Sequence, residues 1–201
     1  MLSLFESDMP SGFAYADDFL TVDEESSLLD EIAVLAFSNV EMRGGIARRR
    51  TAHFGWKYGY YARRTEPGEP LPAFLLAYRE RAARWAGRDA EAFVEALVTE
   101  YPEGAPIGWH RDAPMFGDII GVSLGTSCRM KFRPYVSPDD LRGAGRPPRR
   151  ATHELELARR SIYLLSGSVR GDFEHSVPPV AGRRYSITFR TLASRTGARR
   201  S

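Results

Sequence analysis

The sequence predicts a mainly β domain of the α+β class, in which N-terminal helices pack on a sandwich or barrel of antiparallel strands. Apolar residues recur at helical spacing in two segments before residue 90. After residue 93, short and often alternating segments are separated by glycine, proline or polar turns. The length of 201 residues, with 43% hydrophobic and 27% charged side chains, suits one compact domain.

Both helices are predicted from their start signals and their periodicity. Thr21 is expected to cap the first helix, because three acidic residues at 23–25 follow it and favour the positive end of the helix dipole. Its apolar residues then recur at helical spacing over 28–36. The second helix is expected over about 72–86, and its inward side holds Phe74, Leu75, Tyr78, Ala82 and Trp85.

The strands are predicted from alternation. In the glycine-, arginine- and aromatic-rich segment 40–70, Trp56, Tyr58 and Tyr60 alternate, which indicates a hairpin strand with one aromatic face. Phe93–Tyr101 is expected to begin helical and to end as a strand. Further strands are expected at Ile119–Leu124, Cys128–Phe132, His153–Leu157, Ser161–Leu165 and Tyr185–Leu192. Residues 137–150 are expected to form a loop, and 193–201 a frayed tail.

Composition narrows the class of protein. No apolar run approaches the roughly 20 residues that a membrane span needs, and the N-terminus has no signal-peptide pattern. Cys128 is the only cysteine, which excludes an intramolecular disulfide and multi-thiolate zinc sites. We therefore expect a reduced, cytoplasmic, monomeric protein without membrane contact. The net charge is only +2, although 26 of the 28 basic residues are arginines in clusters, which a genomic bias toward arginine codons would also produce.

Two histidines and an aspartate are the strongest chemical feature. His110 and Asp112 are two residues apart, so an extended chain turns both side chains to the same side. His175 follows near the end of another expected strand. Two imidazoles and one carboxylate on one face of a metal ion leave three positions open, which is the arrangement of non-haem Fe(II) oxygenases. The alternative is a surface aspartate beside a partly buried histidine.

The segment 184–190 is the second feature. Alternation places Arg184, Ser186, Thr188 and Arg190 on one face, with apolar residues between them on the other. Two inward arginines would be costly without negative partners, and a bound dicarboxylate would supply them. A solvated arginine face at a sheet edge is the alternative.

A chain of motifs over residues 95–192 resembles the AlkB family of Fe(II)- and 2-oxoglutarate-dependent dioxygenases, and residues 13–90 are similar more loosely. The motifs are YPEG at 101–104, GWHRD at 108–112, GVSLG at 121–125, RMKFR at 129–133, LLSG at 164–167, HSVPP at 175–179 and RYSITFR at 184–190. The resemblance implies a double-stranded β-helix (jelly-roll) core with N-terminal helices packed on one sheet and a substrate lid. It also implies N-terminal helices and a nucleotide-recognition-like lid in 1–92, the dioxygenase core in 93–192 and a flexible tail in 193–201, within one compact domain.

The resemblance assigns roles position by position. His110, Asp112 and His175 would be the catalytic iron ligands, and O₂ and 2-oxoglutarate would complete the chemistry. Arg184 would pair with the distal carboxylate of 2-oxoglutarate and Arg190 with the carboxylate beside the keto group. Three further co-substrate residues are expected, namely Thr99, Tyr101 and Ser186. Thr99 and Ser186 stand where the family often has asparagine, and Pro114 where base-repairing members often have an acid.

The implied reaction is oxidative dealkylation of N-alkylated bases, and the implied partner is single-stranded DNA or RNA, as in alkylation repair. A target base must leave its stack to reach buried iron, and aromatic faces can hold it there. The expected substrate-binding residues are Arg50, Phe54, Trp56, Tyr58 and Arg111. His53 is interpreted as a loop histidine without a ligand role.

Two other functions remain open at this point. The first is a 2-oxoglutarate dioxygenase that acts on a protein side chain or a small molecule, which the modest net charge and Pro114 favour. The second is a non-catalytic jelly-roll binding module. The complete triad and both arginines oppose the second alternative.

Overall fold

The structure is a computed structural model, and it describes residues 9–42, 44–59, 64–137, 139 and 150–193. Its larger sheet has eight strands in the order β1-β10-β7-β12-β5-β3-β2, with β4 paired to β3. These strands are β1 (Phe13–Ala16), β2 (Ser38–Met42), β3 (Gly45–Gly59), β4 (Arg64–Pro67), β5 (Phe93–Tyr101), β7 (Phe116–Gly125), β10 (Ile162–Leu165) and β12 (Arg184–Leu192).

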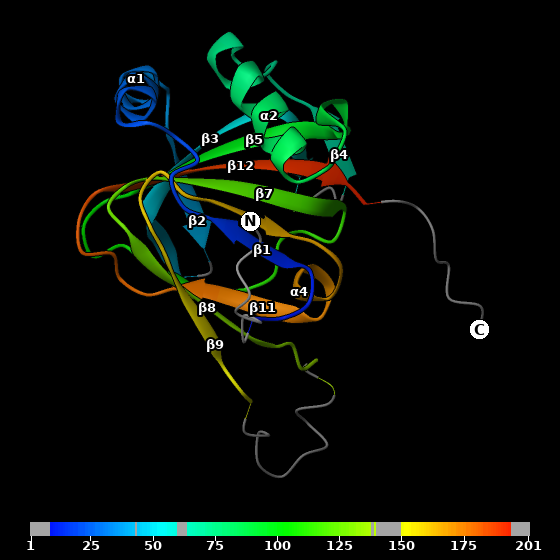
Figure 1. Cartoon of the computed structure of the whole chain (residues 1–201). Helices are drawn as coiled ribbons and strands as arrows, with labels where there is room; N and C mark the ends of the chain where they lie inside the picture. The colour runs from blue at the N-terminus through cyan, green and yellow to red at the C-terminus, as the bar shows by residue number, and fades with distance from the viewer. Residues whose placement is uncertain (1–8, 43, 60–63, 138, 140–149, 194–201) are drawn as a thin grey trace.

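The smaller sheet faces the larger one across the core. It has four strands in the order β6-β11-β8-β9. They are β6 (Ile107–His110), β8 (Cys128–Pro134), β9 (His153–Leu157) and β11 (Phe173–Val177). In Figure 1 the larger sheet lies above β8 and β11, and the short helix α4 (Gly167–Gly171) stands at one end of β11. Every strand pairing is antiparallel, so the two sheets form the predicted antiparallel sandwich.

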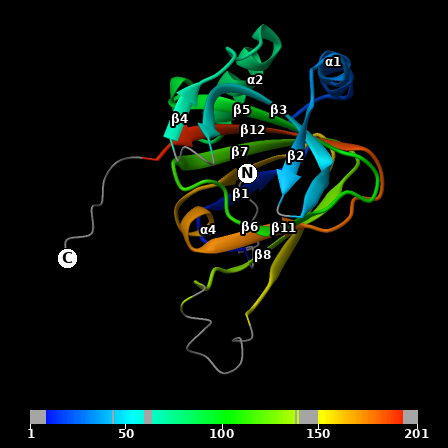
Figure 2. The same ribbon diagram turned by 180° about the vertical axis from the view of Figure 1, so that it is seen from behind.

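Two helices cover the outer face of the larger sheet, as the sequence predicted (Figures 1 and 2). They are α1 (Val22–Ala33) and α2 (Ala73–Trp85). Thr21 caps α1 through a capping box with Glu24, which accounts for the start signal in the sequence. Leu28, Ile32 and Leu75 are buried against strand residues in one hydrophobic cluster.

A second hydrophobic cluster fills the space between the sheets. It contains Ile119, Phe132, Tyr163 and Val177 among others, contributed by both sheets. Because side chains alternate along a strand, the larger sheet therefore packs its two faces against different partners. One face meets the helices, and the other faces the smaller sheet and the cavity described below.

The structure differs from the predicted elements at a few places. Phe93–Tyr101 is strand throughout, because the helical signal before it is confined to a short 3-10 turn at Ala90–Ala92. The N-terminal segment, expected as helices and lid, also adds β1, β2 and β3 to the larger sheet. Most of the expected 137–150 loop and of the 193–201 tail lies outside the described residues.

Gly55 explains a bend within the long strand β3. Its φ is +78°, a left-handed conformation that glycine adopts without strain, and a Cβ there would lie 2.1 Å from the Val94 carbonyl oxygen. Its N–H donates to Glu69 O and its own carbonyl accepts from Gly68 N. Gly55 is the last residue of β3 that pairs with β5, and from Trp56 onward the strand pairs with β4.

Candidate active site

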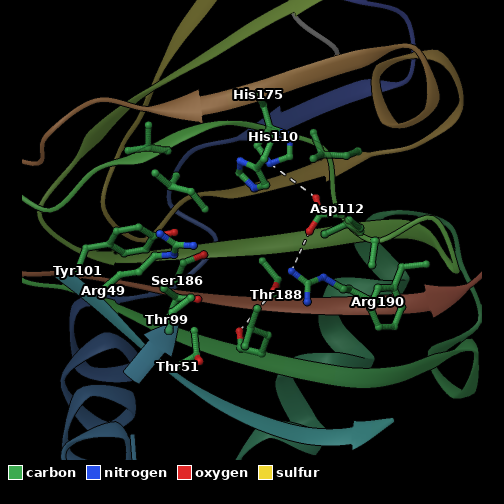
Figure 3. A pocket seen from close by; sticks show the side chains of 18 of the residues that line it. Arg49, Thr51, Thr99, Tyr101, His110, Asp112, His175, Ser186, Thr188 and Arg190 are labelled. Carbon is green, nitrogen blue, oxygen red and sulfur yellow. Dashed lines mark hydrogen bonds and ion pairs between the residues drawn. The ribbon is translucent and has the colours of Figure 1, made fainter. Parts of the chain in front are cut away.

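Strand register brings the two predicted histidine ligands together. The Cα atoms of His110 on β6 and His175 on β11 are direct partners across the smaller sheet. Their ring centroids are 4.3 Å apart. Asp112 follows two residues after His110, and the candidate ligand atoms of the three side chains lie within 4.8 Å of one another. Figure 3 shows the two rings side by side, with Asp112 next to them.

Burial and hydrogen bonding give these groups the protonation states that a metal ion needs. His110 Nδ1 donates to Gly108 O over 2.9 Å, which leaves Nε2 as the lone-pair nitrogen. Burial, with a smaller effect of His110, lowers the pKa of His175 to about 3. Burial alone would raise the pKa of Asp112, but Arg190 and the histidines outweigh it and lower that pKa to about 2. A neutral imidazole and an ionised carboxylate are therefore ready to bind a divalent cation.

The triad lies at a cavity of about 360 Å³ between the two sheets. Its opposite wall is a patch of hydroxyl groups from adjacent strands of the larger sheet (Figure 3). Thr51 lies on β3 and Thr99 on β5, where Thr99 is the direct partner of both Thr51 and Ser186. Thr188 follows Ser186 on the same face of β12. The cavity thus has a metal-binding side and a hydrogen-bonding side.

Arg184 is a buried cation at this cavity. It lies opposite Tyr101 across β5 and β12, and it is only 2% exposed. Its Nε donates to Ser123 Oγ over 3.3 Å, and its guanidinium carbon lies 5.1 Å from the Tyr101 ring centroid. No carboxylate of the described residues forms an ion pair with it. A buried guanidinium without a carboxylate is costly, so this position fits an anionic ligand group.

Arg190, at the other end of β12, is paired instead with two carboxylates. Its Nη2 donates to Asp112 Oδ1 over 2.9 Å, and its Nη1 lies 3.2 Å from Glu95 Oε2. Its Nε is buried and has no hydrogen-bond partner among the described residues. Arg190 therefore holds a metal-site carboxylate and still has one N–H to offer to a ligand.

Gly121 makes room for an aromatic wall of the cavity. A Cβ on Gly121 would lie 2.1 Å from Cζ of Tyr163, so any side chain at this position of β7 would clash with the ring. Burial raises the pKa of Tyr163 far above its usual range, which keeps the phenol neutral. The wall between the triad and Arg184 is thus aromatic and uncharged.

These observations fit Fe(II) and 2-oxoglutarate. The two histidines and the aspartate are the donor set of a 2-His-1-carboxylate iron site. The unpaired guanidinium of Arg184 and the unused Nε of Arg190 are hydrogen-bond donors for a dicarboxylate in the same cavity.

The sequence matches the family model of the 2OG-Fe(II) oxygenase superfamily over residues 12–190. The chain belongs to this superfamily. It is accordingly a dioxygenase that uses Fe(II), 2-oxoglutarate and O₂, and the alternative of a non-catalytic module is wrong.

Similar proteins place this dioxygenase near AlkB. It is 31% identical over 194 residues to "Alkylated DNA repair protein ALKBH8 homolog" of Arabidopsis thaliana, covering 88% of this chain and 54% of that protein. It is 23% identical to the Mus musculus "tRNA (carboxymethyluridine(34)-5-O)-methyltransferase ALKBH8", covering 85% of this chain and 25% of that protein. The chain thus spans about half the length of the Arabidopsis thaliana relative and about a quarter of the length of the Mus musculus relative.

Solved structures support the fold. The structure of OsALKBH1 matches with a TM-score of 0.63 at 15% identity, over 91% of this chain and 98% of that one. A Pseudomonas putida prolyl-4-hydroxylase matches with a TM-score of 0.58 at 15% identity, over 91% of this chain and 93% of that one. The jelly-roll core expected from the sequence is thereby confirmed, and the family model and the Arabidopsis thaliana relative confirm the AlkB-like family. No helix of the described residues is both long and apolar enough to span a bilayer.

The structure brings together every residue that the sequence predicted for metal and co-substrate. All of them line the same cavity: Thr99, Tyr101, His110, Asp112, His175, Arg184, Ser186 and Arg190. The alternation predicted for 184–190 is also present, since the residues between them, Tyr185, Ile187 and Phe189, pack on the helix side.

The predicted substrate residues are dispersed. Phe54 does not line the cavity, because β3 turns its ring into the cluster under the helices, where it is only 8% exposed. Arg50 also points away from the cavity and pairs with Glu100, with 2.6 Å between Nη2 and Oε2. Trp56 is half-buried outside the cavity lining, and the side chain of Tyr58 lies outside the described residues. Arg111 lines the cavity at its edge.

Two cavity residues, His53 and Glu95, were not predicted as site residues, and Arg49 was expected only as a phosphate contact. Arg49 and His53 line the cavity from β3, where they alternate with Arg50 and Phe54 on the other face, so His53 lies on a strand and not on the expected loop. Glu95 is buried on β5, between Arg190 and His53. The signal that could have identified it is a single carboxylate within the otherwise apolar segment 93–98, because a buried charge needs a partner.

Proposed function

We propose that this dioxygenase removes alkyl groups oxidatively from base nitrogens of single-stranded DNA or RNA. The observation that carries the proposal is that the relative named for alkylated DNA repair aligns with 88% of the chain. The triad and both arginines, which all lie between residues 110 and 190, line one cavity in the structure. We further propose His110, Asp112 and His175 as the iron ligands, and Arg184 and Arg190 as the 2-oxoglutarate anchors.

The reaction needs no acid–base group beyond this site. Bound iron supplies the activation of O₂, while 2-oxoglutarate is oxidised to succinate and CO₂. One oxygen atom enters the C–H bond of the N-alkyl carbon, and the resulting hemiaminal loses an aldehyde and restores the N–H. The protein's own residues bind the dicarboxylate at Arg184, keep Asp112 ionised through Arg190, and exclude water with the Tyr101 and Tyr163 wall.

Cavity size supports a single base as the reacting group. A volume of about 360 Å³ is near the lower end of the roughly 300–1,000 Å³ that small-molecule sites span. It has room for 2-oxoglutarate and one planar ring, and not for a stacked duplex. The base must therefore be unpaired or flipped out, which favours single-stranded substrates.

The test is succinate and aldehyde release by the Fe(II)-loaded protein. Single-stranded DNA and RNA of one sequence, with 1-methyladenine or 3-methylcytosine or without modification, are compared, and transfer RNA forms a separate arm. Stimulated turnover with recovery of the unmodified base, seen by mass spectrometry, is expected. Turnover of 2-oxoglutarate that no nucleic acid stimulates would overturn the proposal and support the protein or small-molecule alternative, which Pro114 favours.

A further inference from the structure

The outer face of the smaller sheet carries a second hollow that opens on the metal site. Alternation turns His110, Phe132 and His175 inward, so Trp109 on β6, Arg133 on β8 and Glu174 on β11 face outward. A groove of about 760 Å³ runs from Trp109 and Glu174 to Tyr135 and the α4 residues Gly167 and Gly171. We name this hollow the outer groove. Trp109, Arg111, Tyr135, Arg170 and Glu174 are among the residues that line it. Arg133 lies beside it, in contact with Trp109 and Glu174.

The outer groove adjoins the catalytic cavity. The two hollows share five lining residues, including Arg111 and both metal-site residues of the 110–112 segment. The shared residues are His110, Arg111, Asp112, Ala113 and Phe116. The segment 110–116 thus borders both hollows, so a chain bound in the groove would lie next to the metal-site residues.

Two arginines of the groove are stacked on aromatic rings. The guanidinium carbon of Arg111 lies 3.6 Å from the ring centroid of Tyr135, and that of Arg133 lies 4.1 Å from the Trp109 centroid. A stacked guanidinium keeps its N–H groups in its own plane, so their edges stay available to acceptors beside the ring. Arg111 gives one of these donors to Gly171 O over 3.1 Å and forms no ion pair with a described carboxylate.

The charge of the groove favours an anionic ligand. Glu174 is shared by two arginines, at 2.5 Å from Arg133 Nε and 2.8 Å from Arg150 Nη1. One carboxylate cannot neutralise both, and the lining adds Arg111 and Arg170. The other carboxylate of the lining, Asp112, is already paired with Arg190. Tyr135 remains 36% exposed beside these cations. Cationic edges alternating with aromatic faces are the combination that binds phosphates and stacked bases along a single strand.

We propose that the outer groove binds the single-stranded nucleic acid that flanks the base in the catalytic cavity. The nucleotides beside the target base would contact Trp109 and Tyr135, and their phosphates would contact Arg111 and Arg133. Pro114 lines this groove, so the residue that replaces the expected acid is an apolar wall for the neighbouring nucleotide. The inference rests on the proposed nucleic-acid function, and it places strand binding on the side of the molecule opposite to the predicted 1–92 lid.

The test is the binding of fluorescein-labelled single-stranded DNA and RNA of one sequence, followed by anisotropy. Tyr135→Ala is expected to weaken binding about 5- to 100-fold, the range for the loss of one stacked base. Tyr135→Phe retains the ring and is expected to bind like the wild type. Arg133→Ala should also lower the salt dependence, by about 0.7 in the slope of log K against log salt. Arg84→Ala, which removes an exposed charge of α2 on the far side of the larger sheet, is the matched control.

The outcomes separate the two proposals. If the wild type binds oligonucleotides and both groove variants bind equally tightly while folding normally by thermal melting, the outer groove is not the strand site and the proposed function stands. If the wild type binds no oligonucleotide at low salt, both proposals fall. If Arg84→Ala weakens binding as much as Arg133→Ala does, the effect is one of net charge and the groove is refuted.

Discussion

Arg190 donates to Asp112 Oδ1 over 2.9 Å and so connects the end of β12 directly to the metal-site carboxylate. On its other side, the same guanidinium lies 3.2 Å from Glu95 Oε2. Asp112 keeps a low pKa in part through this contact. The charge of the candidate metal site is therefore set by a buried Asp–Arg–Glu chain rather than by the triad alone.

Glu95→Gln is expected to weaken divalent metal binding about 10- to 100-fold, the usual effect of losing a group that orients or balances a metal ligand. Glu95 is 1% exposed, so its charge is not replaced by solvent. Without it, the positive charge of Arg190 acts on Asp112 alone and opposes the incoming cation. Anaerobic titration with Fe(II) or Co(II) measures the effect. Glu91→Gln, at an exposed ion pair with Arg79, is the matched control, and equal affinities of the two variants would contradict the prediction.

Arg184→Met is expected to separate stability from co-substrate binding. A buried guanidinium without a carboxylate partner costs folding free energy, so a methionine of similar length should raise the Tm of the cofactor-free protein. The same change removes a charge-assisted hydrogen bond worth about 1.5–3 kcal/mol, and the Kd of 2-oxoglutarate should rise roughly 10- to 100-fold. Thermal melting with and without 2-oxoglutarate measures both. A variant that 2-oxoglutarate still stabilises as strongly as wild type would refute the role of Arg184.

Arg49→Ala and Arg50→Ala are expected to act in different ways although the residues are adjacent. Arg49 lines the cavity, so its loss should lower substrate-stimulated turnover. Arg50 lies on the other face of β3, where it pairs with the buried Glu100 and stacks on Phe37. Its loss should lower the free energy of unfolding by about 1–3 kcal/mol and change turnover little. Denaturant unfolding and succinate assays on both variants measure these effects. If Arg49→Ala lowered stability and Arg50→Ala lowered turnover, the side chains of β3 would face the opposite way from the one described.

Part of the candidate site was predictable from spacing along extended chain, and the motif resemblance supplied the roles of its residues. Alternation alone placed Arg184, Ser186, Thr188 and Arg190 on one face, and the spacing of His110 and Asp112 placed them on one side. What alternation cannot supply is the partner strand. The pairing of His175 with His110 across β11 and β6 depends on long-range register, which one sequence does not contain.

The substrate side was harder to predict for the same physical reason. The two faces of β3 are similar in sequence. One face carries Arg49 and His53, and the other carries Arg50 and Phe54, so each face has one cationic and one aromatic residue. The helices decide which face turns toward them, because Phe54 fits their apolar cluster. The outer groove escaped prediction because Trp109 lies in a different sequence segment from Arg133 and Tyr135, and they meet only through the β6-β11-β8 pairing.

Cys128 is expected to make stability fall at alkaline pH. Burial raises the pKa of its thiol, so the native state keeps the proton while the unfolded thiol, with a pKa of about 8.5, loses it. Below that pH both states carry the neutral thiol and the residue contributes no pH dependence. Above it the unfolded state binds fewer protons, and the free energy of unfolding should decrease by up to about 1.4 kcal/mol per pH unit. Cys128→Val should lose this slope in denaturant unfolding between neutral and alkaline pH, and native wild type should react with thiol reagents far more slowly than unfolded chain. Fast labelling of the native protein would show that the thiol is accessible and that its pKa is not raised.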